Sequence, residues 1–134
     1  MTKTTNYQLN QWAKSDRIRM DDFNADNAKI DAALGAMPKI GFGSYSGNSA
    51  ENRTIALGYT PKAVLLFDSK GYTYRYYGGE MFYGGLALEN LPVRNSNGTL
   101  ALLQIVDNGF SVFNADNYYF LNRSGETYYY LTIY

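Results

Sequence analysis

The chain has neither histidine nor cysteine among its 134 residues. Histidine is the commonest general base and a frequent metal ligand, and cysteine supplies disulfides, thiolate zinc sites and thiol nucleophiles. Ser-His-Asp and Cys-His catalytic systems are therefore excluded. No loop shows the spacing of oxygen ligands that a calcium site needs. We therefore expect no metal, no cofactor and no enzymatic activity.

A glycosidase would still need only two carboxylates, held roughly 5–10 Å apart. The sequence offers two candidate pairs, Glu80 with Glu89 and Asp107 with Asp116. Most β-rich domains offer pairs of this kind, so these residues do not by themselves predict a hydrolase. A glycan depolymerase acting through Glu80 or Asp116 nevertheless stays open as an alternative function.

The chain also lacks any excess of charge. Lys+Arg and Asp+Glu both total 12, and residues 1–37 hold five of each sign. A nucleic-acid-binding protein would need a basic stripe, so we expect no nucleic-acid partner. No apolar run approaches the roughly 18 residues that span a bilayer, so we expect no membrane insertion.

Residues 21–37 carry the helical period. Five side chains recur at alternating spacings of four and three, which is the pattern of a coiled-coil seam. They are Phe23, Asn27, Ile30, Leu34 and Met37. Short isolated helices are marginal in water, so this seam needs a partner. The partner is either the same helix in other copies of the chain, giving a trimeric bundle, or the chain's own β-domain.

Residues 1–20 are predicted to form an extended arm before the helix. Its only large apolar residues are Tyr7, Leu9 and Trp12. We expect Trp12 to pin the arm onto a neighbouring surface, in the same chain, in the next protomer or in a larger assembly. The predicted organisation is thus an arm and trimerisation helix over residues 1–38, followed by a head domain over residues 39–134.

From residue 39 onward, apolar residues recur at every second position, which is typical of strands. About eight short strands are separated by turn signals, including Asn97-Gly98 and Asn108-Gly109, and this favours an antiparallel β-sandwich in a mainly β protein. Residues 62–68 form a continuous apolar run, which indicates burial on both faces. Residues 127–134 hold four aromatics, so we expect this strand to pair inside a sheet or with a neighbouring protomer.

Tyrosine is abundant, at 14 residues, and clusters in one stretch. A sugar-binding site needs an aromatic platform for the C–H face of a pyranose and a few polar groups for its hydroxyls. The stretch supplies both, through Tyr72, Tyr74, Arg75, Tyr76, Tyr77, Glu80 and Tyr83. In a strand, Tyr72, Tyr74 and Tyr76 would share one face. These tyrosines equally suit packing in the core.

A second candidate loop covers residues 114–119. The loop contains two polar side chains, Asp116 and Asn117, followed by the aromatic ring of Tyr118. Such residues also suit an ordinary turn. The sequence does not choose between a ligand-binding loop and a plain connection here.

Four blocks of the sequence resemble small tail-fibre and baseplate proteins of bacteriophages and prophages. The first, NYQLNQWAKSDRIRMDDFNADNAKIDAAL at residues 6–34, is similar to their attachment and helix segment. Residues 43–67 and 84–113 resemble strands of their β-domain, and residues 121–134 resemble its closing hairpin. Residues 69–83 match none of these blocks, which makes them a place to look for specificity.

The resemblance implies a homotrimeric virion component, made in the bacterial cytoplasm, with a head similar in layout to the H-type lectins. It implies recognition of a bacterial surface polysaccharide or glycoconjugate, and contacts with other phage tail proteins. The alternative is a purely structural tail or baseplate protein. Its exposed aromatics would then contact virion proteins rather than sugars.

Overall fold

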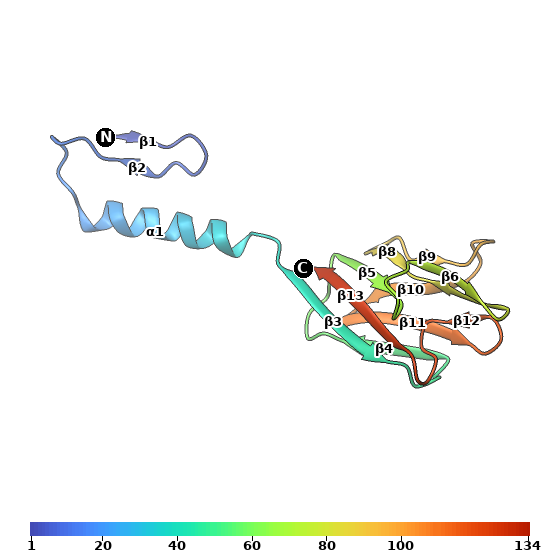
Figure 1. The fold of residues 1–134 in the computed structure, drawn as a ribbon. Coiled ribbons are helices and arrows are strands. Elements are labelled where there is room, and N and C mark those ends of the chain that lie inside the picture. The colour runs from blue at the N-terminus through green and yellow to red at the C-terminus, as the bar shows by residue number, and fades with distance from the viewer. The chain divides into compact units, whose positions relative to one another are not determined.

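The computed structural model describes all residues, 1–134, and these form two compact units, Met1–Pro38 and Lys39–Tyr134 (Figure 1). The protein is mainly β, with a single helix, and the expected β-sandwich class is confirmed for the second unit.

The N-terminal unit is a small hairpin on a helix. Strand β1 (Thr2–Lys3) pairs antiparallel with β2 (Asn10–Gln11), and α1 spans Met20–Gly35. The prediction of an extended arm over residues 1–20 was wrong, because polar contacts fold the hairpin back onto the helix. The backbone N–H of Asn10 donates to Asp26 Oδ2 at 2.8 Å, and Lys29 Nζ donates to the Gln8 carbonyl at 2.6 Å.

Helix α1 therefore uses its polar face within the unit and leaves its apolar face open. Asp22, Asp26 and Lys29 are half-buried beneath the hairpin. By contrast, Phe23 is 58%, Ile30 42% and Leu34 61% exposed. No residue of the helix is buried.

The helix is shorter than its sequence pattern predicts. It ends at Gly35, and the backbone N–H of Ala36 closes the last turn on the Ala32 carbonyl at 3.1 Å. Met37 precedes Pro38, a residue that cannot continue a helix. Met37 was thus wrongly included in the helical seam. Asn27 lies on the helix and is exposed.

Two sheets form the head. The four-stranded sheet has the order β3-β13-β5-β8, with β3 at Ile40–Ser46, β13 at Thr127–Ile133, β5 at Ala63–Phe67 and β8 at Gly85–Leu88. The seven-stranded sheet has the order β6-β7-β12-β11-β10-β9, and β4 also pairs with β11. Its strands are β4 (Asn52–Ala56), β6 (Tyr74–Tyr77), β7 (Glu80–Tyr83), β9 (Val93–Arg94), β10 (Ala101–Val106), β11 (Gly109–Ala115) and β12 (Tyr119–Phe120).

Most strand pairs are antiparallel, and the exception is β12 with β7, which pair in parallel. The tight turn between β10 and β11 contains Asp107 and Asn108, with Val106 opposite Gly109. The turn was predicted one residue later, at Asn108-Gly109. Asn108 takes the left-handed conformation there, at φ 61°. Gly109 instead belongs to the strand, where a Cβ would lie 2.1 Å from the Ile55 carbonyl oxygen.

Strand β13 lies between β3 and β5, so the expectation that it pairs inside a sheet is confirmed. Strand β5 was expected to be buried on both faces. Val64 and Leu66 are fully buried, whereas Leu65 and Phe67 on its other face are only half-buried. Within one chain, that second face has no layer covering it.

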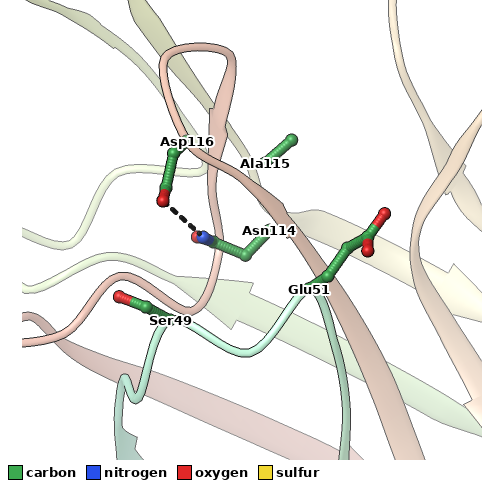
Figure 2. A pocket seen from close by; sticks show the side chains of 5 residues that line it. All are labelled: Ser49, Glu51, Asn114, Ala115 and Asp116. Atoms are coloured by element: carbon green, nitrogen blue, oxygen red, sulfur yellow. Dashed lines mark hydrogen bonds between the residues drawn. The ribbon is translucent and has the colours of Figure 1, made fainter.

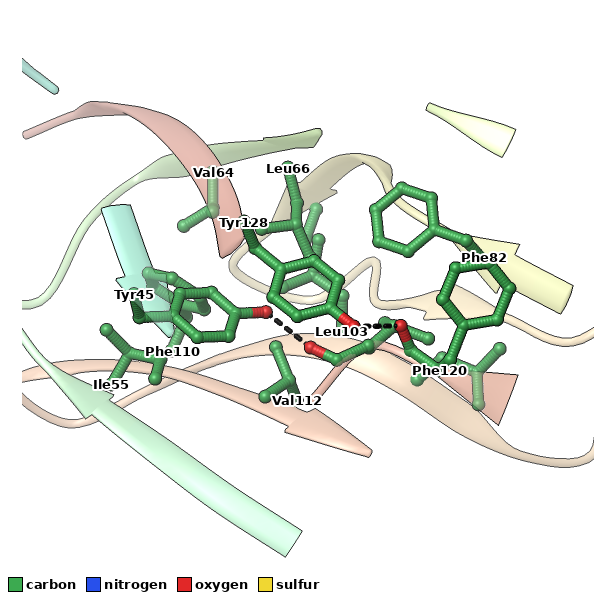
Figure 3. Packing of buried hydrophobic residues seen from close by; sticks show 13 residues of the cluster. Tyr45, Ile55, Val64, Leu66, Phe82, Leu103, Phe110, Val112, Phe120 and Tyr128 are labelled. Atoms are coloured by element: carbon green, nitrogen blue, oxygen red, sulfur yellow. Dashed lines mark hydrogen bonds between the residues drawn. The ribbon is translucent and has the colours of Figure 1, made fainter. Parts of the chain in front are cut away.

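The core lies between the sheets and is rich in aromatic rings (Figure 3). Tyr128 of β13 stacks on Tyr45 of β3 at 5.0 Å and on Phe82 of β7 at 5.8 Å. Both buried hydroxyls find acceptors across the sandwich. Tyr45 donates to the Leu121 carbonyl at 2.6 Å, and Tyr128 donates to the Phe120 carbonyl at 2.5 Å.

Burial makes these two hydroxyls weaker acids than an exposed tyrosine. It raises the pKa of Tyr128 to about 12 and raises the pKa of Tyr45 well above its usual range. An unfolded tyrosine ionises near pH 10, so between about pH 10 and 12 the unfolded chain loses these protons while the folded head keeps them. The folded state is then disfavoured as the pH rises.

We predict that the free energy of unfolding is nearly flat between about pH 7 and 9.5 and falls by at least about 2 kcal/mol between pH 10 and 12, the loss expected from Tyr128 alone, to which Tyr45 adds. The Tyr128→Phe variant should show a smaller alkaline loss. It should also be less stable by about 1–3 kcal/mol at neutral pH, because the buried Phe120 carbonyl loses its donor. Urea unfolding across pH measures both effects. Tyr129→Phe, on the half-exposed neighbour, serves as the control, and equal curves for the two variants would contradict the prediction.

Candidate functional site

Four tyrosines share the outer face of strands β6, β7 and β12. We call this set, Tyr74, Tyr76, Tyr83 and Tyr119, the tyrosine row. Tyr74 lies opposite Tyr83, while Tyr76 and Tyr119 both lie opposite Met81. Their neighbours Phe82 and Phe120 point the other way, into the core. The alternation of each strand therefore separates core rings from surface rings.

Three rings of the tyrosine row, those of Tyr74, Tyr83 and Tyr119, pack edge to face, while Tyr76 takes part in neither ring pair. Tyr74 and Tyr83 lie 5.2 Å apart at 63°, and Tyr83 and Tyr119 lie 6.1 Å apart, also at 63°. Tyr118, on the loop before β12, continues the series at 6.5 Å from Tyr119. Tyr76 is 64% and Tyr74 53% exposed, so ring surface remains open to solvent. The row thus forms a fixed aromatic surface and is not part of the core.

Arg75 does not lie on this surface. It points to the other side of β6, where its Nε lies 2.6 Å from Asp68 Oδ2 and its side chain is 13% exposed. Its guanidinium also lies over the Phe120 ring at 5.0 Å. Asp68 is almost fully buried, and its Oδ1 accepts the backbone N–H groups of Lys70 and Tyr72, both at 2.9 Å. The pair therefore clamps the connection from β5 to β6.

Glu80 is also engaged within the head. Its Oε2 pairs with the Arg123 guanidinium, and its Oε1 accepts the backbone N–H of Asn117 at 2.9 Å. Arg123 lies in turn over the Phe120 ring at 4.5 Å. Of the two charged groups predicted to bind a ligand here, Arg75 and Glu80, neither is free in the structure.

The remaining tyrosines of the predicted stretch lie apart from the row. Tyr72 precedes β6 in the loop that Asp68 holds, and Tyr77 ends β6 on the same side as Arg75. Both are exposed, at 54% and 62%. The expectation that Tyr72 shares a strand face with Tyr74 and Tyr76 was wrong, because β6 begins only at Tyr74.

A polar pocket of about 210 Å³ opens beside the β11–β12 loop (Figure 2). It is lined by Ser49, Glu51, Asn114, Ala115 and Asp116. Ala115 is also the strand partner of Tyr119, so the pocket adjoins the tyrosine row through one step of the β-ladder. The structure thereby brings Asp116 and the aromatic stretch of the sequence to one region of the head.

Buried amides hold the walls of this pocket in place. Asn114, 3% exposed, accepts the backbone N–H of Asn122 at 3.2 Å and donates its Nδ2 to Asp116 Oδ1 at 3.3 Å. Its backbone N–H donates to the Glu51 carbonyl at 2.8 Å. Fully buried Asn122 in turn accepts at its carbonyl the backbone N–H of Ser49, at 2.7 Å. The pocket is therefore organised in advance of any ligand.

Reasoning from sequence missed Ser49 and Glu51, and it included Asn114 and Tyr119 only as the ends of the candidate loop, without giving either a role. Tyr119 was assigned to a strand without asking which face it would occupy. Its alternation with Phe120 was the available signal. The contribution of Ser49 and Glu51 depends on contacts between segments more than 60 residues apart, which no local pattern reveals.

No family model, no curated protein and no solved structure matches this chain. No group of three or more acidic side chains is placed to hold a metal ion. The helix is too short and too polar to cross a membrane.

Because Arg75 is buried in an ion pair, its loss should act on stability. We predict that Arg75→Ala lowers the free energy of unfolding by about 3–5 kcal/mol, since it leaves the Asp68 charge buried without a counter-charge. Thermal and urea unfolding measure the effect. Arg94→Ala, on an exposed arginine of β9, should cost less than about 0.5 kcal/mol. A stable Arg75→Ala protein would show that the pair contributes little.

Proposed function

We propose that this protein is a bacteriophage or prophage tail protein whose head binds a glycan of the bacterial surface. The observation that carries the proposal is the tyrosine row, a rigid, solvent-open aromatic surface on a β-sandwich. An aromatic ring of this kind offers its face to the C–H groups of a pyranose. The row also fits the resemblance of the sequence to tail-fibre and baseplate proteins with a lectin-like head.

The polar pocket supplies the second requirement of sugar recognition. Asp116 and Glu51 carry acceptors for sugar hydroxyls, while the buried Asn114 amide fixes the position of Asp116. Ala115 of the pocket is the strand partner of Tyr119, whereas Asn114 lies opposite Phe120 on the other face, so a glycan chain that contacts both the row and the pocket would pass over the β11–β12 loop. The proposed activity is binding without cleavage. Loss of glycan chain length on incubation with the protein would reveal a depolymerase instead.

Binding at one such surface would be weak, because the pocket is small and open. The exposed apolar side of α1, with Phe23, Ile30 and Leu34, supports the proposal that several copies are gathered, as a homotrimer. Several heads on one assembly raise the overall affinity through effective concentration. A trimer has a mass of about 45 kDa, three times the chain's 15.1 kDa.

We predict that Tyr74→Ala and Tyr76→Ala each weaken adsorption to host cells roughly 2- to 12-fold per site, since an aromatic contact contributes about 0.5–1.5 kcal/mol. Adsorption of labelled protein to whole cells and a glycan array measure the loss. Multivalency would magnify it. Both side chains are exposed, so the fold should be unchanged.

Tyr7→Ala is the matched control, because Tyr7 is 60% exposed but lies in the N-terminal unit. It should adsorb like the parent protein. If Tyr74→Ala and Tyr76→Ala both adsorb fully, the tyrosine row is not the binding surface.

A second variant tests the pocket. Asp116→Ala should weaken glycan binding about 10- to 150-fold, because a hydrogen bond to a charged acceptor contributes about 1.5–3 kcal/mol. Asp107→Ala, which removes an exposed carboxylate from the β10–β11 turn, should leave binding unchanged. Isothermal titration with the oligosaccharide selected by the array compares the two, and equal affinities would exclude the pocket.

The competing function is a structural role in the tail or baseplate. The exposed apolar residues of α1 favour it, because such residues commonly bind protein. Under this alternative the glycan array stays blank, while the immobilised protein captures other tail proteins from a phage lysate.

A further inference from the structure

The outer face of the four-stranded sheet is apolar and uncovered. Its most prominent members are Ile40, Phe42, Leu65, Leu86, Tyr129 and Leu131, which we call the outer apolar face. The register makes them neighbours: Leu131 lies opposite Phe42 on one side and Leu65 on the other, and Leu65 lies opposite Leu86. Phe42 is 78% and Ile40 61% exposed.

Charge is entirely absent from this sheet. Strands β3, β13, β5 and β8 contain no Asp, Glu, Lys or Arg. The outer side of the seven-stranded sheet, by contrast, carries polar side chains suited to contact with water. They are Thr54 of β4, Ser111 of β11 and Gln104 of β10. A sheet with one solvated side normally alternates apolar and polar residues. The sequence pattern of the four-stranded sheet is instead typical of a sheet that is covered on both sides.

The size of the face can be compared with known interfaces. With about 150–200 Å² for a fully exposed large side chain, Ile40, Phe42, Leu86 and Tyr129 expose about 400 Å², and their half-buried neighbours raise this to on the order of 600 Å². That is the upper end of what a monomer leaves exposed. Two such faces together would bury about 1,200 Å², the lower end of specific, stable interfaces.

The occupant that fits is another copy of this chain. A face without charge offers no electrostatic selection for a different protein, but it is complementary to itself, as symmetric interfaces require. The covalent chain supports this choice. Only residues 36–39 lie between the end of α1 and Ile40, and these four span at most about 14 Å. A parallel association of copies through α1 therefore brings the beginnings of their β3 strands close together.

We propose that the outer apolar face is the surface through which the heads of different copies pack on one another. This inference goes beyond the proposed function, because it holds whether the head binds a glycan or a tail protein. The outer sides of β5 and β13 are then buried in the assembly. The tyrosine row lies on the other sheet and stays free.

The test uses the full chain in sedimentation equilibrium at micromolar concentration. Phe42→Asp and Leu86→Asp each place a charge on the face, at positions exposed in the single chain, and should raise the dissociation constant at least about tenfold. Tyr76→Asp, of comparable exposure on the other sheet, should change it less than about twofold. A monomeric parent protein, or unchanged association of both face variants, would overturn the proposal. If Leu34→Asp alone dissociates the assembly, the helix holds the copies and the sheet does not.

A second measurement does not depend on charge at the face. The chain has no cysteine, so Leu86→Cys and Tyr76→Cys each introduce a single thiol. In the assembly, a maleimide should label the thiol at position 86 at least about tenfold more slowly than the one at position 76. Dilution below the dissociation constant should remove the difference. Equal rates in the assembled protein would show that the face is open to solvent. Glycan binding, assayed separately, has no bearing on either result.

Discussion

Two tyrosine hydroxyls hold the sandwich in its register. Tyr45 and Tyr128 come from adjacent strands of one sheet and donate to the carbonyls of Leu121 and Phe120, consecutive residues at the end of β12. A β12 of two residues has little pairing of its own. These bonds fix it, and β12 then positions β7 through their parallel pair and the loop that carries Asp116. Both the tyrosine row and the pocket thus depend on contacts made inside the core.

Tyrosine serves opposite purposes on the inside and the outside of the sandwich: Tyr45 and Tyr128 of the four-stranded sheet point into the core, and the tyrosine row lies on the outer side of the seven-stranded sheet. Inside, a tyrosine ring fills volume and its hydroxyl must find an acceptor, because an unpaired buried hydroxyl is costly. Outside, the ring lies against its neighbours and leaves its face free. Tyr119 and Phe120 show the division at a single step along the chain. Alternation within the strand decides which role a ring takes, so the high tyrosine content does not itself identify a binding protein.

The fold class and the place of β13 inside a sheet follow from local sequence, because strand period and turn residues are local properties. The hairpin of the N-terminal unit did not follow. It forms through Asp26 and Lys29, which look like an ordinary solvated helix face until Asn10 and Gln8 are placed against them. Arg75 was assigned to ligand binding for a related reason. Its partner Asp68 lies seven residues earlier, across a turn, and only the folded chain brings the two charges together.

Both errors concern charged groups, and they change how the site works. With Arg75 and Glu80 engaged in ion pairs, the exposed surface near the tyrosine row has aromatic rings and the acceptors of Asp116 and Glu51, but no cation from that stretch. Such a surface suits neutral sugars with free hydroxyls better than acidic polysaccharides, because carboxylates repel an anionic chain. Neutral sugars gain little from long-range attraction, so under the proposed function adhesion would depend on the number of sites engaged at once. The exposed apolar side of α1 and the outer apolar face both lack charge. They are consistent with this requirement, since each offers copies of the chain a surface for association.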